Sequence, residues 1–163
     1  MIKEVDIKVA CGGLVAVGNK IVLHVVDCEY RIFDLNLKHT GTIPMKMTKC
    51  PFLSYHNDKL YFAQCTTNTV FCYDMTGNCV WEFKDERLLK PHGIATDKYG
   101  LVYVCGYDSL NIIVISSHGG RARELVNLRG IMKNPDCLNY RKQRDRLLVL
   151  SRDQSKLLEF SFI

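Results

Sequence analysis

Short apolar runs recur along the chain and are separated by Gly, Asn and Asp. The runs KLYFAQ (59–64), LVYVCGY (101–107) and NIIVISS (111–117) are rich in β-branched and aromatic residues. Runs of this length and composition are typical of strands, and their apolar positions do not follow helical spacing. The pattern therefore predicts an all-β fold.

Four segments of the chain align with one another without internal gaps. They cover residues 18–36, 56–78, 98–120 and 144–163. Successive aligned positions lie 40, 42 and 45 residues apart, within the range of about 40 to 50 that β-propeller blades show. These positions are Ile21, Tyr61, Tyr103 and Leu148. The repeat predicts four blades of four antiparallel strands.

Turn residues punctuate each repeat. In the third repeat, strands are expected at 92–97, 101–107, 111–117 and 121–128, with short Gly-containing or Asp-containing turns between them. Asp97 is expected to be a turn residue preceding Gly100. Prolines precede each new innermost strand, where a missing backbone donor breaks no ladder hydrogen bond. The expected blades cover about 11–48, 51–88, 91–132 and 135–163, with boundaries near Pro51, Pro91 and Pro135.

The fourth repeat ends after three strands, and residues 2–9 (IKEVDIKV) precede the first blade. We expect residues 2–9 to form a sixteenth strand that pairs with 157–160 and closes the ring, which would remove two exposed edges. Residues 1–163 would then form a single domain. The alternative is that the four blades are a fragment of a larger, six-bladed ring.

The segment 88–120 resembles an NHL repeat, the blade found at the C-terminus of tripartite-motif proteins of the Brat and LIN-41 type. The resemblance rests on Pro91, Gly93, Ile94, Ala95, Asp97, Gly100, Val102, Tyr103, Val104, Asn111, Ile112, Val114, Ile115 and Gly119. It implies a partner-binding platform for a protein or for single-stranded RNA. The RING and B-box modules that carry ligase activity in that family have no counterpart here, since the sequence has no CxxC pair.

Composition narrows the function further. No apolar run is long enough to cross a bilayer, and charges interrupt the first ten residues, so a cytoplasmic protein is expected. Cys65, Cys72 and Cys79 lie seven residues apart, but that offset in paired strands does not converge ligands. Buried, reduced thiols are therefore favoured over a metal cluster, and no cofactor is expected.

The histidines give no enzyme signature. His24, His39, His56, His92 and His118 are scattered over the repeats. An enzyme of this fold would converge polar groups from several blades onto the axis. The starts of the innermost strands, Pro51-Phe52, Pro91-His92 and Pro135-Asp136, do not form such a set. The sequence therefore predicts a binding protein without catalytic residues.

Charge is concentrated late in the chain. Residues 1–120 hold 12 basic and 12 acidic side chains, whereas 121–156 hold 10 basic and 4 acidic ones. Blade geometry divides them between two faces. The candidate ligand face, at the starts of the innermost strands, is expected to carry Arg129, Lys133, Arg152 and Lys156, with Tyr107 and His92. The opposite face is expected to carry Arg121, Arg141, Lys142, Arg144 and Arg146.

A basic face with an aromatic side chain is compatible with two kinds of partner. A protein partner is favoured, because Tyr107 alone is placed on the ligand face to stack a base. Single-stranded RNA is the alternative, since the cations can follow phosphates. No DNA or membrane partner is expected.

Overall fold

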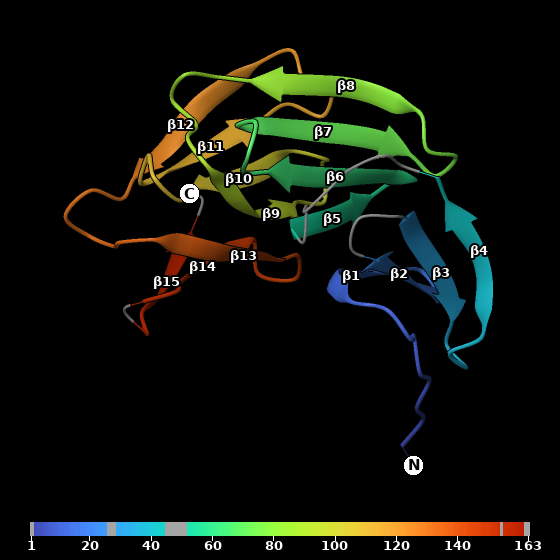
Figure 1. Ribbon diagram of the computed structural model, residues 1–163. Helices are drawn as coiled ribbons and strands as arrows, with labels where there is room; N and C mark the ends of the chain where they lie inside the picture. Colours follow the sequence, from blue (N-terminus) through green and yellow to red (C-terminus); the bar gives the residue numbers. More distant parts are fainter. Residues whose placement is uncertain (1, 26–28, 45–51, 154, 162–163) are drawn as a thin grey trace.

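The computed structural model describes residues 2–25, 29–44, 52–153 and 155–161. All regular elements of these residues are strands, which form four antiparallel sheets (Figure 1). Each sheet is a meander of consecutive strands, here called blades 1 to 4. The fold is therefore an all-β, four-bladed propeller, as the repeat predicted. Within the described residues, no helix is long and apolar enough to span a membrane.

The strands of each blade follow the order of the chain. Blade 1 holds β1 (Cys11–Val17), β2 (Lys20–Val25), β3 (Glu29–Asp34) and β4 (His39–Ile43). Blade 2 holds β5 (Phe52–His56), β6 (Lys59–Gln64), β7 (Thr69–Asp74) and β8 (Cys79–Lys84). Blade 3 holds β9 (Pro91–Thr96), β10 (Val102–Gly106), β11 (Asn111–Ile115) and β12 (Ala122–Asn127). Blade 4 holds β13 (Pro135–Arg141), β14 (Arg146–Ser151) and β15 (Leu157–Ser161).

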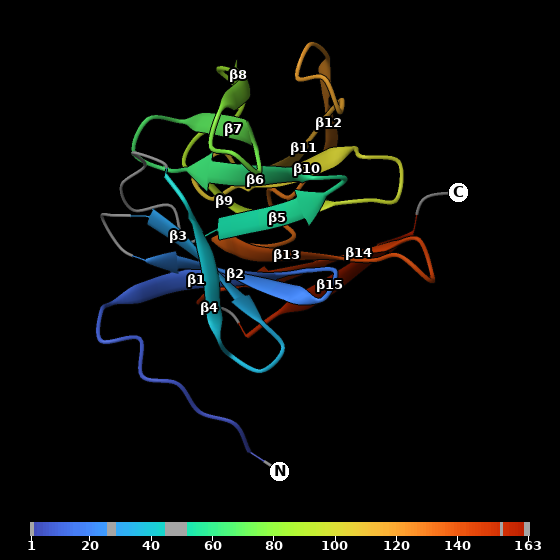
Figure 2. The ribbon, with the colours of Figure 1, turned by 90° about the vertical axis from the view of Figure 1, so that its right-hand side faces the viewer.

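The first strand of each blade is innermost. β5 packs beside β1 and β9, and β9 packs beside β13. A cavity of about 430 Å³ at the centre is lined by residues from all four innermost strands, among them Leu14, Tyr55, Thr96 and Tyr140. In Figures 1 and 2 the two terminal blades both lie below blades 2 and 3, and Figure 1 shows blade 4 on the left and blade 1 on the right.

Aspartates fix the turns between strands in three blades. Asp34, Asp74 and Asp97 each accept hydrogen bonds from two backbone N–H groups two and four residues further on, at 2.8 or 2.9 Å. These contacts let the side chain hold a tight reversal that would otherwise leave donors unpaired. Asp97 is therefore a turn residue, as predicted, and its second oxygen accepts from the Tyr103 hydroxyl at 3.1 Å.

Three buried apolar clusters hold consecutive blades together. One lies between blades 1 and 2 and includes Tyr30 and Phe62. The second lies between blades 2 and 3, and the third joins blade 3 to blade 4. Strand aromatic side chains contribute to these clusters between blades: Tyr61, Phe71, Tyr73, Trp81, Phe83 and Tyr103.

The predicted ring closure is wrong. Residues 2–9 form no strand, and β15 has β14 as its sheet neighbour. The segment instead runs beside blade 1, where the Lys3 ammonium donates to the Asn36 side chain at 2.7 Å. Val5, Ile7 and Val9 alternate with charged residues, but Val5 and Val9 are exposed, so the alternation alone does not secure pairing with a strand. The boundary predicted at Pro51 and the end of the chain at 162–163 lie outside the described residues.

Candidate ligand-binding face

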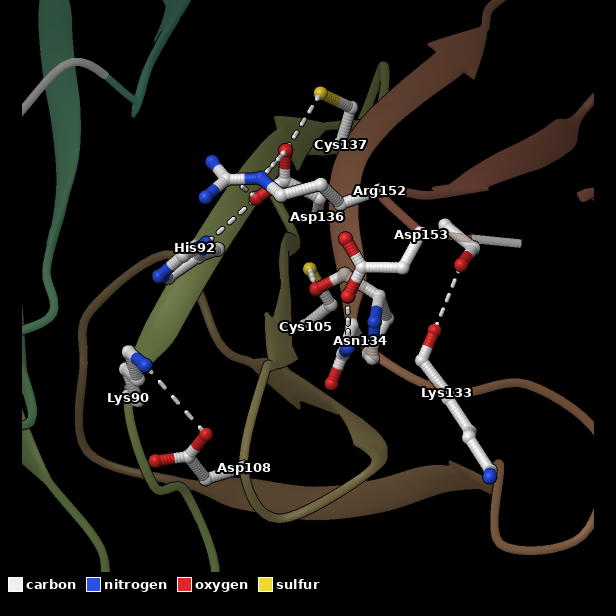
Figure 3. Close-up of polar contacts among 12 residues, drawn as sticks. Lys90, His92, Cys105, Asp108, Lys133, Asn134, Asp136, Cys137, Arg152 and Asp153 are labelled. Atoms are coloured by element: carbon white, nitrogen blue, oxygen red, sulfur yellow. Dashed lines mark hydrogen bonds and ion pairs between the residues drawn. The ribbon is translucent and has the colours of Figure 1, made fainter. Parts of the chain in front are cut away.

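A buried pair of polar side chains lies where blades 3 and 4 begin. His92 follows the proline that opens β9, and Asp136 follows the proline that opens β13 (Figure 3). The His92 Nδ1 atom lies 2.6 Å from the Asp136 Oδ1 atom, and both residues are nearly inaccessible to water. A hydrogen bond of this length between buried groups fixes the orientation of the imidazole ring.

Arg152 completes a triad with this pair. Its Nη2 atom lies 3.1 Å from Asp136 Oδ1, and its Nε donates to Oδ2 at 3.2 Å. The two contacts engage both carboxylate oxygens, as arginine forks do. Hydrogen bonding to the Asp136 carboxylate raises the pKa of Arg152. Asp136 thus neutralises a cation that was expected to be available to a ligand.

Aromatic rings enclose His92. The Phe52 ring stacks on it with centroids 4.8 Å apart, and the Tyr107 ring lies 4.6 Å away on a tilted plane. The Lys90 ammonium lies 4.5 Å from the centroid of the Tyr107 ring, and Lys90 also pairs with Asp108 at 3.7 Å. Tyr107 is therefore already engaged by a histidine and by a cation.

The repeat places these residues at equivalent positions. The backbone N–H of Tyr107 donates to Lys90 O, and that of Arg152 donates to Asn134 O, at 3.0 and 3.1 Å. Tyr107 in blade 3 thus corresponds to Arg152 in blade 4, just as His92 corresponds to Asp136. Phe52, His92 and Asp136 at the strand starts differ in type, so the sequence pattern did not indicate a shared site there. Complementary types at equivalent positions were the signal that could have revealed the pair.

The other predicted residues of the ligand face lie apart from the triad. Arg129, Lys133 and Lys156 line a hollow of about 250 Å³, together with Leu110 and the exposed Ile131. The Lys156 ammonium donates to the carbonyl oxygen of Ile131. This hollow lies at the connection that leads from blade 3 into blade 4, so the three cations line a hollow of their own and do not form part of the triad.

A second hollow lies at the connection between blades 2 and 3. It measures about 380 Å³ and is lined by Thr67, Asn68, Lys84, Asp85, Glu86 and the exposed Leu89. Both hollows therefore combine one exposed aliphatic side chain with charged neighbours. The sequence pattern did not indicate Leu89 or Ile131, because the exposure of these side chains depends on how the connection between two blades folds.

The basic residues predicted on the opposite face are dispersed. Arg141 pairs with Glu159 at 3.5 Å, and Lys142 lines the central cavity. Arg121 lines a hollow of about 210 Å³, and Arg144 lies in the turn that leads into Arg146 at the start of β14. The pKa of His56 is lowered first by burial and second by the positive charge of Lys142. These residues converge on no common partner among the described part of the chain.

The remaining candidates show no clustering. Within the described residues, no group of three or more His, Cys, Asp or Glu side chains is arranged to hold a metal ion. The six described cysteines are free. Cys72 is buried, but Cys79 is exposed on β8, so the expectation that the three evenly spaced thiols share burial is wrong for Cys79. Cys28 and Cys50 lie outside the described residues.

Comparison with known proteins shows a shared fold. No protein-family model and no curated protein matches the sequence. The chain is similar to the computationally designed Ika4 protein, with a TM-score of 0.70, 12% identity, and coverage of 96% of this chain and 93% of that one. It is similar to the RRP9 WD40 repeats, with a TM-score of 0.72, 12% identity, and 94% and 52% coverage.

A third solved structure also shares the fold of this chain. BamB from Moraxella catarrhalis matches with a TM-score of 0.63 and 18% identity, over 93% of this chain and 44% of that one. The chain thus spans about half the length of RRP9 and BamB. At these identities the matches establish a β-propeller fold.

Proposed function

We propose that this protein is a non-catalytic recognition propeller that binds another protein through its ligand face. The observation that carries the proposal is the internal pairing of the groups a nucleic acid would need. Arg152 is paired with Asp136, and the Tyr107 ring is engaged by His92 and Lys90. A phosphate-binding surface needs available cations, and base stacking needs an open ring face.

The two hollows support the same proposal. Leu89 and Ile131 are exposed aliphatic side chains at the rims of neighbouring connections, each bordered by charged residues. Aliphatic anchors surrounded by a polar rim are characteristic of protein–protein interfaces. The NHL-like pattern of the third blade fits a recognition module, and a place in a ligase of the tripartite-motif kind is part of this proposal.

A catalytic role is not proposed. His92 would be the natural base, but only 5% of the residue is exposed and its ring is flanked by Phe52 and Tyr107. A general base must reach the proton it removes. In this arrangement the imidazole instead serves to join two blades.

The test compares proteins that co-purify with the tagged chain. We expect Leu89→Asp combined with Ile131→Asp to abolish capture of a protein that the unmodified chain retains. The matched control carries Arg141→Ser and Arg144→Ser on the opposite face and should retain that protein. Equal capture by both variants would contradict a ligand face at the two hollows.

Single-stranded RNA is the second candidate, because Arg129, Lys133 and Lys156 line one hollow. If RNA is the ligand, neutralising these three residues should flatten the plot of log affinity against log salt by about 0.7 for each lost phosphate contact. Neutralising Arg141, Lys142 and Arg144 should leave the slope unchanged. Absence of RNA binding at physiological salt would leave the protein partner as the function.

A further inference from the structure

Each junction between blades joins the same two kinds of sheet face. Because side chains alternate along a strand, every blade has one face toward the preceding blade and one toward the following blade. In blade 3, Val102 and Ile113 pack toward blade 2, whereas Tyr103 and Ile112 pack toward blade 4. We call these the preceding-side face and the following-side face.

The following-side face of blade 4 carries exposed leucines among polar residues. Ser151 pairs with Pro135, which opens blade 4, and Gly106 pairs with Pro91, which opens blade 3. Leu150 therefore occupies the position in blade 4 that Cys105 occupies in blade 3. Leu157 pairs with Leu150 as Ile112 pairs with Cys105. Cys105 and Ile112 are fully buried, whereas Leu150 is 43% and Leu157 61% exposed.

The preceding-side face of blade 1 is uncovered in the same way. Leu23 pairs with Leu14, as Phe62 pairs with Leu53 in blade 2. Phe62 is fully buried against blade 1. Leu14, by contrast, is 67% exposed, and Leu23 is only half-buried.

Among the described residues, no buried apolar cluster joins blade 4 to blade 1, although their innermost strands line the same central cavity. The three buried clusters of the described residues join blades 1 and 2, 2 and 3, and 3 and 4. The uncovered faces are a following-side face on blade 4 and a preceding-side face on blade 1, and these are the two kinds of face that meet at each of those three junctions. A fourth junction of the same type is therefore available, with a following-side face on one side and a preceding-side face on the other.

We propose that a second copy of this chain covers both faces, with blade 4 of each copy packed against blade 1 of the other. The contact is heterologous, and two such contacts related by a twofold axis close a ring of two chains. The matches to RRP9 and BamB support this geometry, since the four blades superpose on about half of each of those propeller chains.

Charge selects the register of the proposed junction. Arg31 pairs with Leu23 on the preceding-side face of blade 1, and Glu159 pairs with Leu148 on the following-side face of blade 4. The corresponding residues at the junction of blades 3 and 4 are Leu158 and Val114, which belong to one cluster. Arg31 of one copy would therefore lie beside Glu159 of the other, where opposite charges attract.

The present contacts of these two residues are weak enough to be exchanged. Arg31 bonds to Glu29 at 2.8 Å and reaches the carbonyl oxygen of Ile7 at 3.5 Å, while Glu159 lies 3.5 Å from Arg141. All four of these side chains are partly or fully exposed. Ion pairs of this kind contribute little to stability.

The first test is the mass of the protein in solution, by light scattering coupled to gel filtration. We expect twice the 18.7 kDa of one chain. Leu150→Glu combined with Leu157→Glu should give the mass of one chain with an unchanged strand spectrum. Val80→Glu, on the exposed edge strand of blade 2, is the matched control and should keep the doubled mass. A single-chain mass for the unmodified protein would overturn the proposal.

The second test uses charge reversal and distinguishes this junction from any other dimer. Arg31→Glu and Glu159→Arg should each give a single chain, because like charges then face each other at both junctions. Mixing the two variants should restore a dimer, since the introduced glutamate would meet the introduced arginine at one junction and the native pair would form at the other. Failure of the mixture to associate, or dimers of each variant alone, would overturn the proposed register.

Discussion

His92 and Asp136 occupy the same position in consecutive blades, and their side chains lie 2.6 Å apart across the blade junction. The pair links two innermost strands where apolar packing between blades ends at the candidate ligand face. Arg152, which follows β14, contacts both carboxylate oxygens, so Asp136 connects a strand start in blade 3 with the residue that follows β14 in blade 4.

Replacing Asp136 should destabilise the protein. Asp136→Asn removes the charge that both His92 and Arg152 contact, and it leaves the buried His92 imidazole poorly satisfied, whereas the exposed Arg152 can turn to water. We expect the free energy of unfolding in urea to fall by about 2 kcal/mol. Asp108→Asn is the control, since the exposed pair with Lys90 should contribute less than about 1 kcal/mol. Equal effects of the two substitutions would contradict the role assigned to Asp136.

Gly93 is required by the close approach of β9 and β13. A Cβ atom at this position would lie 2.4 Å from the backbone nitrogen of Leu138 and 2.7 Å from the carbonyl carbon of Cys137. Gly93→Ala should therefore force the two strands apart and cost about 1–3 kcal/mol. Gly120→Ala, where a Cβ has open space, should leave the melting temperature nearly unchanged. A neutral Gly93→Ala variant would show that the strands are not packed this closely.

Stability should fall in alkaline solution. Burial raises the pKa of the Cys72 thiol to about 11 from its ordinary 9.0, and burial also raises the pKa of Cys105. Above pH 9 the unfolded chain loses these protons while the folded chain retains them, so the unfolded state is favoured as pH rises. The loss from Cys72 continues up to about pH 11.

Urea unfolding at pH 8 and pH 10.5 measures this effect. The expected slope is up to about 1.4 kcal/mol per pH unit for each buried thiol. Cys72→Ala should lower stability at pH 8, because it removes packed atoms, yet show a smaller further decline at pH 10.5. The same decline with and without the thiol would assign the alkaline effect to other groups.

Removing residues 2–9 should have little effect on stability. Their described contacts are polar: the Lys3 ammonium donates to Leu35 O and to Asn36 at exposed sites, and Arg31 reaches Ile7 O at 3.5 Å in a partly buried one. We expect a change of less than about 1 kcal/mol in the free energy of unfolding, since surface contacts of this kind rarely exceed that value. A fall of several degrees in melting temperature, measured by calorimetry, would show that this segment stabilises the fold.

The sequence by itself determined the strands and the blade repeat. The blade 3 strands could be read from the runs 101–107 and 111–117, because short β-branched runs bounded by turn residues have few other stable conformations. Asp97 could be assigned to a turn for a similarly local reason, since its bonds reach only two and four residues along the chain.

The tertiary structure decided the relationships between blades. That Asp136 would approach His92, and thereby occupy Arg152, depends on the spacing of β9 and β13, which no local pattern encodes. The predicted ring closure is wrong for the same reason, since it too depended on contacts between blades. Residues 2–9 have an isolated-strand pattern, but pairing with 157–160 depends on where blades 1 and 4 lie in space. Long-range contacts are selected by packing and charge across the whole fold, whereas strands and turns depend on neighbouring residues.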